Sequence, residues 1–169
     1  MRINRKKFIY LISPNKIEKS FYLNLADVLK LRKVSFFQLR LKNVSIQKKL
    51  IIGRKIKKIC QKYNTKFLVN DDVFLANKLG SDGCHLGQRD MNIMKARKII
   101  KKKIIGITCH NSIKLAKLAI KNNADYLAFM AFNDTRTKKT KYKANIKLLK
   151  KIKKITKIPI VAIGGINSN

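Results

Sequence analysis

Short apolar runs alternate along the chain with longer segments in which apolar and basic residues recur at helical spacing. The runs are rich in β-branched and aromatic residues, which favours extended strands, and the longer segments have the period of amphipathic helices. The runs predict seven strands, at Phe8–Ser13, Val34–Leu39, Lys66–Val69, Gly83–Leu86, Ile104–Thr108, Tyr126–Phe132 and Ile158–Ile163. The periodic segments predict helices at about 16–31, 45–63, 72–80, 92–102, 111–123 and 144–156. Regular alternation of strand and helix predicts an α/β fold with parallel strands covered by helices.

Seven strands of this kind suit two architectures, an open doubly wound sheet or a (β/α)8 TIM barrel. A glycine-rich turn after the first strand would favour the open sheet, and the sequence has none there. Gly164 and Gly165 follow the seventh strand, which favours the barrel, because barrels often bind phosphate after strands 7 and 8. Asn169 stands just past that strand. We therefore expect one barrel domain over residues 1–169, truncated after strand 7, with a C-terminal helix–strand–helix missing.

The composition is strongly basic without the pattern of a nucleic-acid module. The chain has 41 Lys and Arg against 8 Asp and Glu, giving a net charge of +33. Of the basic residues, 33 are Lys and 8 are Arg, whereas base readers and phosphate forks favour Arg. Most lysines alternate with apolar residues at helical spacing, as on the solvated face of an amphipathic helix. We expect no specific nucleic-acid partner, and a basic RNA-associated protein remains the non-enzymatic alternative.

The sequence shows neither a membrane helix nor a secretory signal, and this predicts the cellular location of the protein. No apolar run approaches the roughly 20 residues of a membrane helix, and the basic N-terminus has no apolar stretch of the kind a secretory signal needs. Three cysteines, Cys60, Cys84 and Cys109, are an odd number. We therefore expect a cytoplasmic protein without a disulfide framework and without a membrane partner.

Polar side chains follow six of the predicted strands, and function in parallel α/β folds collects at the carboxyl ends of strands. Arg40, Lys42 and Lys138 are cations suited to phosphoryl oxygens. Four of the eight acidic residues lie between 71 and 90. Among them Asp71 and Asp90 are hard oxygen ligands, and Mg²⁺ is usually held by one or two carboxylates and substrate phosphates. Together these residues predict a Mg²⁺–diphosphate site.

Five of the acidic residues also have a purely structural interpretation. The Asn70-Asp71-Asp72 run suits a helix N-cap, and Asp90 suits the cap of a helix starting near Met91. Asp82 and Asp125 each precede a strand and suit turns.

The two Cys-His pairs, Cys84-His85 and Cys109-His110, do not favour a zinc site. Adjacent residues of a strand point to opposite faces, so the two members of a pair cannot share one ion. We expect His85 to be packed inside the fold and His110 to lie in a loop near the site.

At these same positions the chain resembles the thiamine-phosphate synthase family of (β/α)8-barrel enzymes. The resemblance covers nearly the whole chain in order. Its most specific part is the run from Asn70-Asp71 to Asp82-Gly-x-His-Leu-Gly-Gln-x-Asp90. The matching segments are FFQLRLK (36–42), FLVNDDVFLANKLGSDGCHLGQRDM (67–91), IIGITCHNS (104–112), ADYLAFMAFNDTRTK (124–138) and IPIVAIGGI (158–166).

The resemblance implies a Mg²⁺-dependent transferase that joins hydroxymethylpyrimidine diphosphate to thiazole phosphate, giving thiamine phosphate and diphosphate. Arg40, Thr108 and Lys138 would be catalytic, and Asp71 and Asp90 would be the metal ligands. The pyrimidine diphosphate would be held by Gln38, Leu39, Arg40, Leu41, Lys42, Asn70, Thr108 and Lys138. The thiazole phosphate would be held by Thr135, Arg136, Thr137 and Gly165. Self-association into a homo-oligomer is also implied.

The chain departs from the family pattern at a few positions. Met130 stands where the family usually has Gly, and Asn133-Asp134 replaces an aromatic-Pro pair. Thr108 replaces the commoner Ser and keeps its hydroxyl. Asp134 adds negative charge beside the proposed thiazole-phosphate site. These departures keep open a pseudoenzyme left by truncation, and a thiazole tautomerase-like enzyme, a barrel relative, is the other enzymatic alternative.

Overall fold

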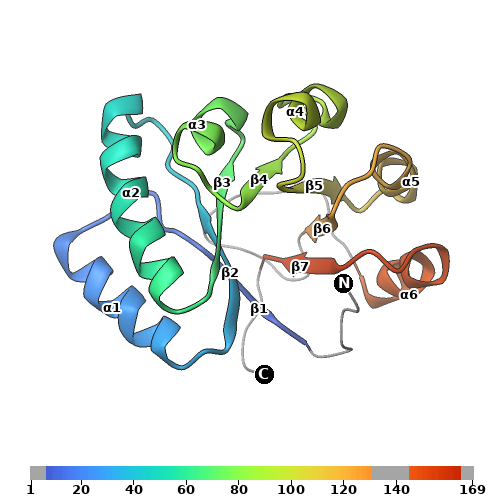
Figure 1. Ribbon diagram of the computed structural model, residues 1–169. Helices are drawn as coiled ribbons and strands as arrows, with labels where there is room; N and C mark the ends of the chain where they lie inside the picture. The colour runs from blue at the N-terminus through green and yellow to red at the C-terminus, as the bar shows by residue number, and fades with distance from the viewer. Residues whose placement is uncertain (1–6, 131–144, 165–169) are drawn as a thin grey trace. The chain divides into compact units, whose positions relative to one another are not determined.

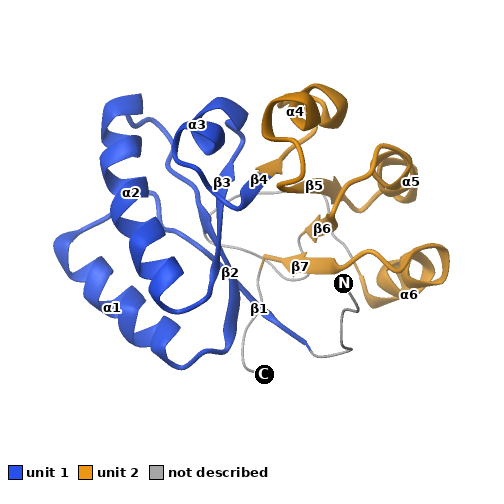
Figure 2. Cartoon of the chain, in the orientation of Figure 1, with its two compact units in different colours: residues 1–84 blue, residues 85–169 orange. Residues whose placement is uncertain are grey.

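The computed structural model describes residues 7–130 and 145–164. The chain divides into two compact units, Met1–Cys84 and His85–Asn169, which are coloured separately in Figure 2. Each unit is an α/β arrangement in which strands alternate with helices.

The first unit runs β1 (Ile9–Ile12), α1 (Lys19–Lys30), β2 (Val34–Leu39), α2 (Ile46–Lys62), β3 (Lys66–Asn70) and α3 (Val73–Lys78). β1 pairs with β2 and β2 with β3, both in parallel, and α1 lies beside α2 (Figure 1). The short strand β4 (Gly83–Leu86) begins at the end of this unit and continues into the second.

The second unit continues with α4 (Ile93–Ile100), β5 (Ile104–His110), α5 (Ile113–Lys121), β6 (Tyr126–Met130), α6 (Ile146–Ile155) and β7 (Ile160–Ile163). β5 pairs with β6 and β6 with β7, again in parallel. Gly106 is in register with Tyr126, and Leu127 with Ile160.

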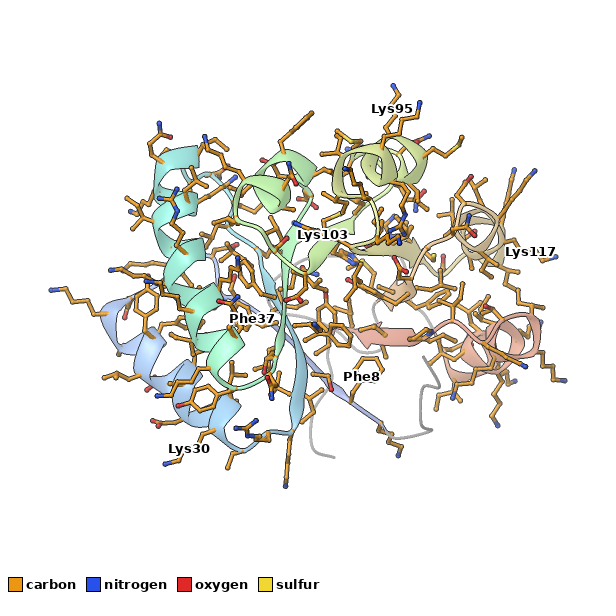
Figure 3. All side chains as sticks on the ribbon, in the orientation of Figure 1. Phe8, Lys30, Phe37, Lys95, Lys103 and Lys117 are labelled. Atoms are coloured by element: carbon orange, nitrogen blue, oxygen red, sulfur yellow. The ribbon has the colours of Figure 1, made fainter. Side chains whose placement is uncertain are left out.

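Each unit has its own apolar core. In the first, Phe37, Phe67 and Ile56 are almost completely buried, and the Phe37 ring lies 6.3 Å from that of Phe21. In the second, Leu127, Phe129, Ile105 and Ile152 are buried. Lysines such as Lys30, Lys95 and Lys117 project outward from their helices (Figure 3). The amphipathic pattern therefore predicts the buried and solvated faces correctly.

Five of the helices in the described part of the chain begin at a side-chain cap. Ser45, Asp72, Asn92, Ser112 and Asn145 each accept a hydrogen bond from the backbone N–H three residues on. Such caps satisfy one of the unpaired amides of the first turn, which explains why the helices start where they do.

All the predicted strands and helices are present, with small shifts at their ends. β5 extends two residues further, to His110, so this residue ends a strand rather than lying in a loop. β7 begins at Ile160, because Pro159 has no N–H to give to a ladder. Residues 131 and 132 of the sixth predicted strand lie outside the described part of the chain.

Asp82 and Asp125 form the same clamp in the two units. The Asp82 backbone N–H donates to the carbonyl of Phe67, and its carboxylate accepts the Phe67 N–H, both at 2.9 Å. Asp125 bonds to Ile105 in the same reciprocal way, both at 2.8 Å. Lys66 and Arg97 pair with the two carboxylates. The turn interpretation of both aspartates is confirmed, and each also anchors the start of the preceding strand.

Across the helices that the structure describes, none has both the length and the apolar character that crossing a membrane requires.

Candidate active site

The end of β2 carries five of the predicted site residues. Gln38 is 2% exposed and donates from Nε2 to the Tyr10 hydroxyl at 2.7 Å. β2 ends at Leu39, so Arg40 and Lys42 lie beyond the strand and do not continue its alternation with Gln38.

Ser13 fixes the backbone of Arg40. The Arg40 N–H donates to Ser13 Oγ at 2.8 Å, and the same hydroxyl donates to the Arg40 carbonyl at 3.3 Å. Ser13 follows β1 and is itself buried. Both backbone polar groups of Arg40 are therefore fixed by one side chain, which limits the positions that the guanidinium can reach.

The chain turns sharply where β3 ends. Asp71 has a φ of 65°, and the Asp72 N–H closes the turn by donating to the Asn70 carbonyl at 2.8 Å. Positive φ is uncommon for a residue with a side chain, although Asp tolerates it better than most. Asp72 caps α3 by accepting from the Leu75 N–H at 2.8 Å. The cap interpretation of this run is thus confirmed for Asp72, while Asp71 faces a cation.

That cation is Lys42, whose Nζ lies 2.8 Å from Oδ2 of Asp71. The two side chains are 48% and 33% exposed, so the pair is open to solvent. The contact is a charge-assisted hydrogen bond between Lys42 and the Asp71 carboxylate, which the sequence predicts as a metal ligand.

A small hollow lies beside these residues within the first unit. It is lined by Leu39, Leu41, Lys49, Val69, Asn70 and Leu75. Three of the predicted substrate-binding residues, Leu39, Leu41 and Asn70, therefore share one lining. The leucines are buried, so their side chains supply an apolar wall.

Asp90 follows β4 and does not cap α4. Its Oδ2 accepts the Gly87 N–H at 2.6 Å, and Asn92 is the residue that caps the helix. The N-cap interpretation of Asp90 is therefore wrong. A Cβ atom at position 87 would lie 3.0 Å from Asp90 Oδ2, so glycine lets the carboxylate approach the backbone closely.

Thr108 lies near the end of β5 and is 8% exposed. Its hydroxyl lies 2.8 Å from Nε2 of His85, and its carbonyl accepts a hydrogen bond from the Gln88 side-chain amide. Nδ1 of His85 lies 2.8 Å from the Tyr126 hydroxyl. The expectation that His85 is packed inside the fold is confirmed.

The sequence predicts only that Tyr126 lies in a strand and does not predict its contact with His85. A signal was nonetheless present. Thr108, His85 and Tyr126 are polar residues within runs that are otherwise apolar, and buried polar groups in such runs need partners.

Two cysteines are buried and unsuited to act as nucleophiles. Burial raises the pKa of Cys60 to about 12, and the negative charge of Asp82 adds to the effect. Burial alone raises the pKa of Cys109 to about 12. Both thiols therefore stay protonated at neutral pH. Residues 7–130 and 145–164 contain no group of three His, Cys, Asp or Glu side chains arranged to hold a metal ion.

Several predicted site residues lie outside the described part of the chain: Thr135, Arg136, Thr137, Lys138 and Gly165. The departures at Asn133 and Asp134 fall there too. Met130, the third departure, is the last residue of β6 and is partly exposed.

Comparisons with known proteins agree with one another. Residues 9–169 match the family model described as thiamine monophosphate synthase. A thiamine-phosphate synthase of Pelagibacter ubique is 66% identical over 162 residues, which cover 95% of this chain and 78% of the relative. One from Saccharophagus degradans is 40% identical over 134 residues, covering 79% of this chain and 62% of the relative.

A solved structure is also similar. The thiamine phosphate pyrophosphorylase from Pyrococcus furiosus matches with a TM-score of 0.82 and 31% identity, covering 95% of this chain and 76% of that one. The likeness, with the alternation of strands and helices, shows the expected α/β fold of the TIM-barrel type.

Proposed function

Because this chain belongs to the thiamine monophosphate synthase family, we propose that it joins hydroxymethylpyrimidine diphosphate to thiazole phosphate and releases diphosphate. The 66% identity to a relative of that name over 95% of the chain is the observation that carries the proposal. The chain spans 78% of the length of the Pelagibacter relative and 62% of the Saccharophagus relative. The activity of these longer proteins is therefore proposed for this chain. The substrates are small molecules, and we expect the reaction to take place in the cytoplasm.

The reaction breaks the bond between the pyrimidine methylene carbon and the diphosphate oxygen, and the electron pair leaves with diphosphate. The thiazole nitrogen then gives its lone pair to the methylene carbon and forms the new C–N bond. A thiazole nitrogen needs no general base to attack. The site is therefore expected to bind and orient its substrates and to neutralise charge on the leaving group.

The described residues supply groups for these tasks. Arg40, on a backbone held by Ser13, would donate to the diphosphate oxygens. Asn70, Leu39 and Leu41 are proposed to contact the pyrimidine diphosphate on the family resemblance, and all three line one small hollow. Gln38, whose amide donates a hydrogen bond to the Tyr10 hydroxyl, would bind the same substrate at the end of β2. Thr108 would donate its hydroxyl to the same substrate. On the family resemblance, Lys138 is proposed as a second cation that binds the diphosphate. On the same basis, the thiazole phosphate would be bound by Thr135, Arg136, Thr137 and Gly165.

We further propose that Asp71 and Asp90 hold Mg²⁺. The chemistry of the donors fits, because both are carboxylates, which Mg²⁺ prefers. The ammonium of Lys42, which lies 2.8 Å from Oδ2 of Asp71, would be displaced by Mg²⁺ at Asp71 and would then be released to meet the diphosphate. Asp90 is kept in place by its bond to the Gly87 N–H. When bound, Mg²⁺ would supply positive charge to the diphosphate. Asp71 and Asp90 belong to different units, and their pairing rests on the sequence resemblance.

The proposal is tested by offering the purified chain two reactions in the presence of Mg²⁺. In one, hydroxymethylpyrimidine diphosphate and thiazole phosphate are supplied, and thiamine phosphate is followed by chromatography. In the other, a thiazole carboxylate phosphate alone is supplied, and its isomerisation is followed. We expect product only in the first. Isomerisation without thiamine phosphate would replace the proposal with the tautomerase alternative, and inactivity of a chain that is folded by circular dichroism would indicate a pseudoenzyme.

A further inference from the structure

Thr108, His85 and Tyr126 form a buried chain of hydrogen bonds in the second unit. Thr108 Oγ1 lies 2.8 Å from His85 Nε2, and His85 Nδ1 lies 2.8 Å from the Tyr126 hydroxyl. The three residues are 8%, 5% and 4% exposed. Buried hydrogen bonds of this kind hold their members in fixed orientations, because breaking one leaves a desolvated polar group.

The geometry of the chain is fixed by packing as well. The rings of His85 and Tyr126 are stacked, with centroids 5.6 Å apart and planes inclined by 21°. Tyr126 is in register with Gly106, and a Cβ atom at position 106 would overlap the tyrosine ring. Glycine at this position therefore makes the space in which the phenol reaches His85.

The direction of the bonds decides what Thr108 can offer a ligand. A neutral imidazole has one N–H donor and one acceptor nitrogen. If the Tyr126 hydroxyl donates to Nδ1, the proton is on Nε2 and is donated to Thr108 Oγ1. The Thr108 O–H is then left to donate to another group. In the opposite tautomer, the Thr108 O–H is directed to Nε2 and Thr108 presents only lone pairs.

A diphosphate has acceptor oxygens only, so it is matched by the first arrangement and not by the second. We propose that Tyr126 and His85 are positioning residues, which fix the tautomer so that the Thr108 hydroxyl donates to the diphosphate of the pyrimidine substrate. This inference rests on the proposed function, since it assumes that Thr108 meets that substrate. Neither Tyr126 nor His85 needs to touch the substrate, because each acts through its neighbour.

The test uses inorganic diphosphate with Mg²⁺ as the probe and measures its dissociation constant by calorimetry. Tyr126→Phe removes only the phenol oxygen, and Thr108→Val removes the hydroxyl at nearly constant volume. We expect each to weaken binding about 3- to 10-fold, the value of one hydrogen bond. If Tyr126 acts through Thr108, the double variant binds no more weakly than Thr108→Val alone. Tyr63→Phe, at the end of α2, is the matched control and should bind as the wild type does.

A second comparison does not depend on Tyr126. His85→Gln keeps a side-chain N–H donor, whereas His85→Leu has none, so we expect Gln to retain more diphosphate affinity than Leu. In turnover, the KM for the pyrimidine diphosphate should rise in the Leu variant while the KM for thiazole phosphate stays the same. A general structural defect would change both.

Multiplicative losses in the double variant, or unchanged binding in folded Tyr126→Phe, would overturn the inference. So would equal affinities of His85→Gln and His85→Leu. A chain that binds diphosphate with the expected coupling and yet forms no thiamine phosphate would refute the proposed function and leave the positioning role intact. A chain that forms thiamine phosphate without coupling between Tyr126→Phe and Thr108→Val would support the proposed function and refute the positioning role.

Discussion

Lys42 and Asp71 form an ion pair just beyond the ends of the neighbouring strands β2 and β3, with 2.8 Å between Nζ and Oδ2. Exposed pairs contribute little to stability, typically about 0–1 kcal/mol. Asp71 also adopts a positive φ, which is unfavourable for most residues. Because such a pair adds little to stability, we propose that the Asp71 carboxylate serves ligand binding.

Asp71→Asn tests this explanation. Asparagine tolerates positive φ as aspartate does, so the turn should persist while the charge is lost. We expect the affinity for inorganic diphosphate with Mg²⁺ to fall by about 10- to 100-fold, the value of a charged interaction, with little change in the melting temperature. Asp27→Asn, on the exposed side of α1, alters the net charge equally and should have no effect. Equal affinities of the two variants would refute the metal role of Asp71.

Arg40→Ala is expected to raise the KM for the pyrimidine diphosphate and to lower kcat. The side chain would stabilise charge that grows on the leaving group, so the loss in kcat/KM should reach about 100-fold. The KM for thiazole phosphate should change little. Steady-state kinetics with each substrate varied in turn would measure this, with Arg54→Ala on the exposed face of α2 as the control. If both variants lose the same activity, net charge rather than Arg40 is responsible.

Gly106→Ala should destabilise the chain much more than Gly53→Ala. At position 106 the new methyl would overlap the buried Tyr126 ring, and overpacking of this severity costs about 3 kcal/mol. At position 53, in α2, the nearest atom is Leu79 Cδ1 at 2.7 Å, the end of a flexible side chain, and alanine has the better helix propensity. We expect Gly53→Ala to change the free energy of unfolding by less than about 1 kcal/mol. Urea denaturation would show the order, and the reverse order would contradict the packing described for Tyr126.

The raised thiol pKa values of Cys60 and Cys109 predict slow modification and a loss of stability in alkali. With pKa values of about 12, against 9.0 for an ordinary thiol, the folded chain should react with iodoacetamide far more slowly than the denatured chain at pH 8. The folded state favours the protonated thiols. Their contribution to stability is therefore complete below pH 9 and is lost as the pH rises towards 12. Rapid labelling of both cysteines in the native chain would contradict their burial.

The sequence predicts the order of elements well because strand and helix leave different periods in the hydrophobic pattern. It locates Asp71 and Thr108 at strand ends for the same reason. It misplaces the cap of α4, since Asp90 and Asn92 both have suitable side chains and only the backbone shows that Asp90 turns back to Gly87. The hydrogen bond between Tyr126 and His85 joins residues 41 positions apart, on β6 and β4, which no local pattern records.

The most direct test of the central claim is the stoichiometry of product formation. The purified chain would be incubated with hydroxymethylpyrimidine diphosphate, thiazole phosphate and Mg²⁺, and thiamine phosphate and diphosphate would be measured together over time. We predict equal amounts of the two products from the wild-type chain, and formation of both about 100-fold slower with Arg40→Ala at the same enzyme and low substrate concentrations. Diphosphate released without thiamine phosphate, or equal product from both chains, would contradict the account.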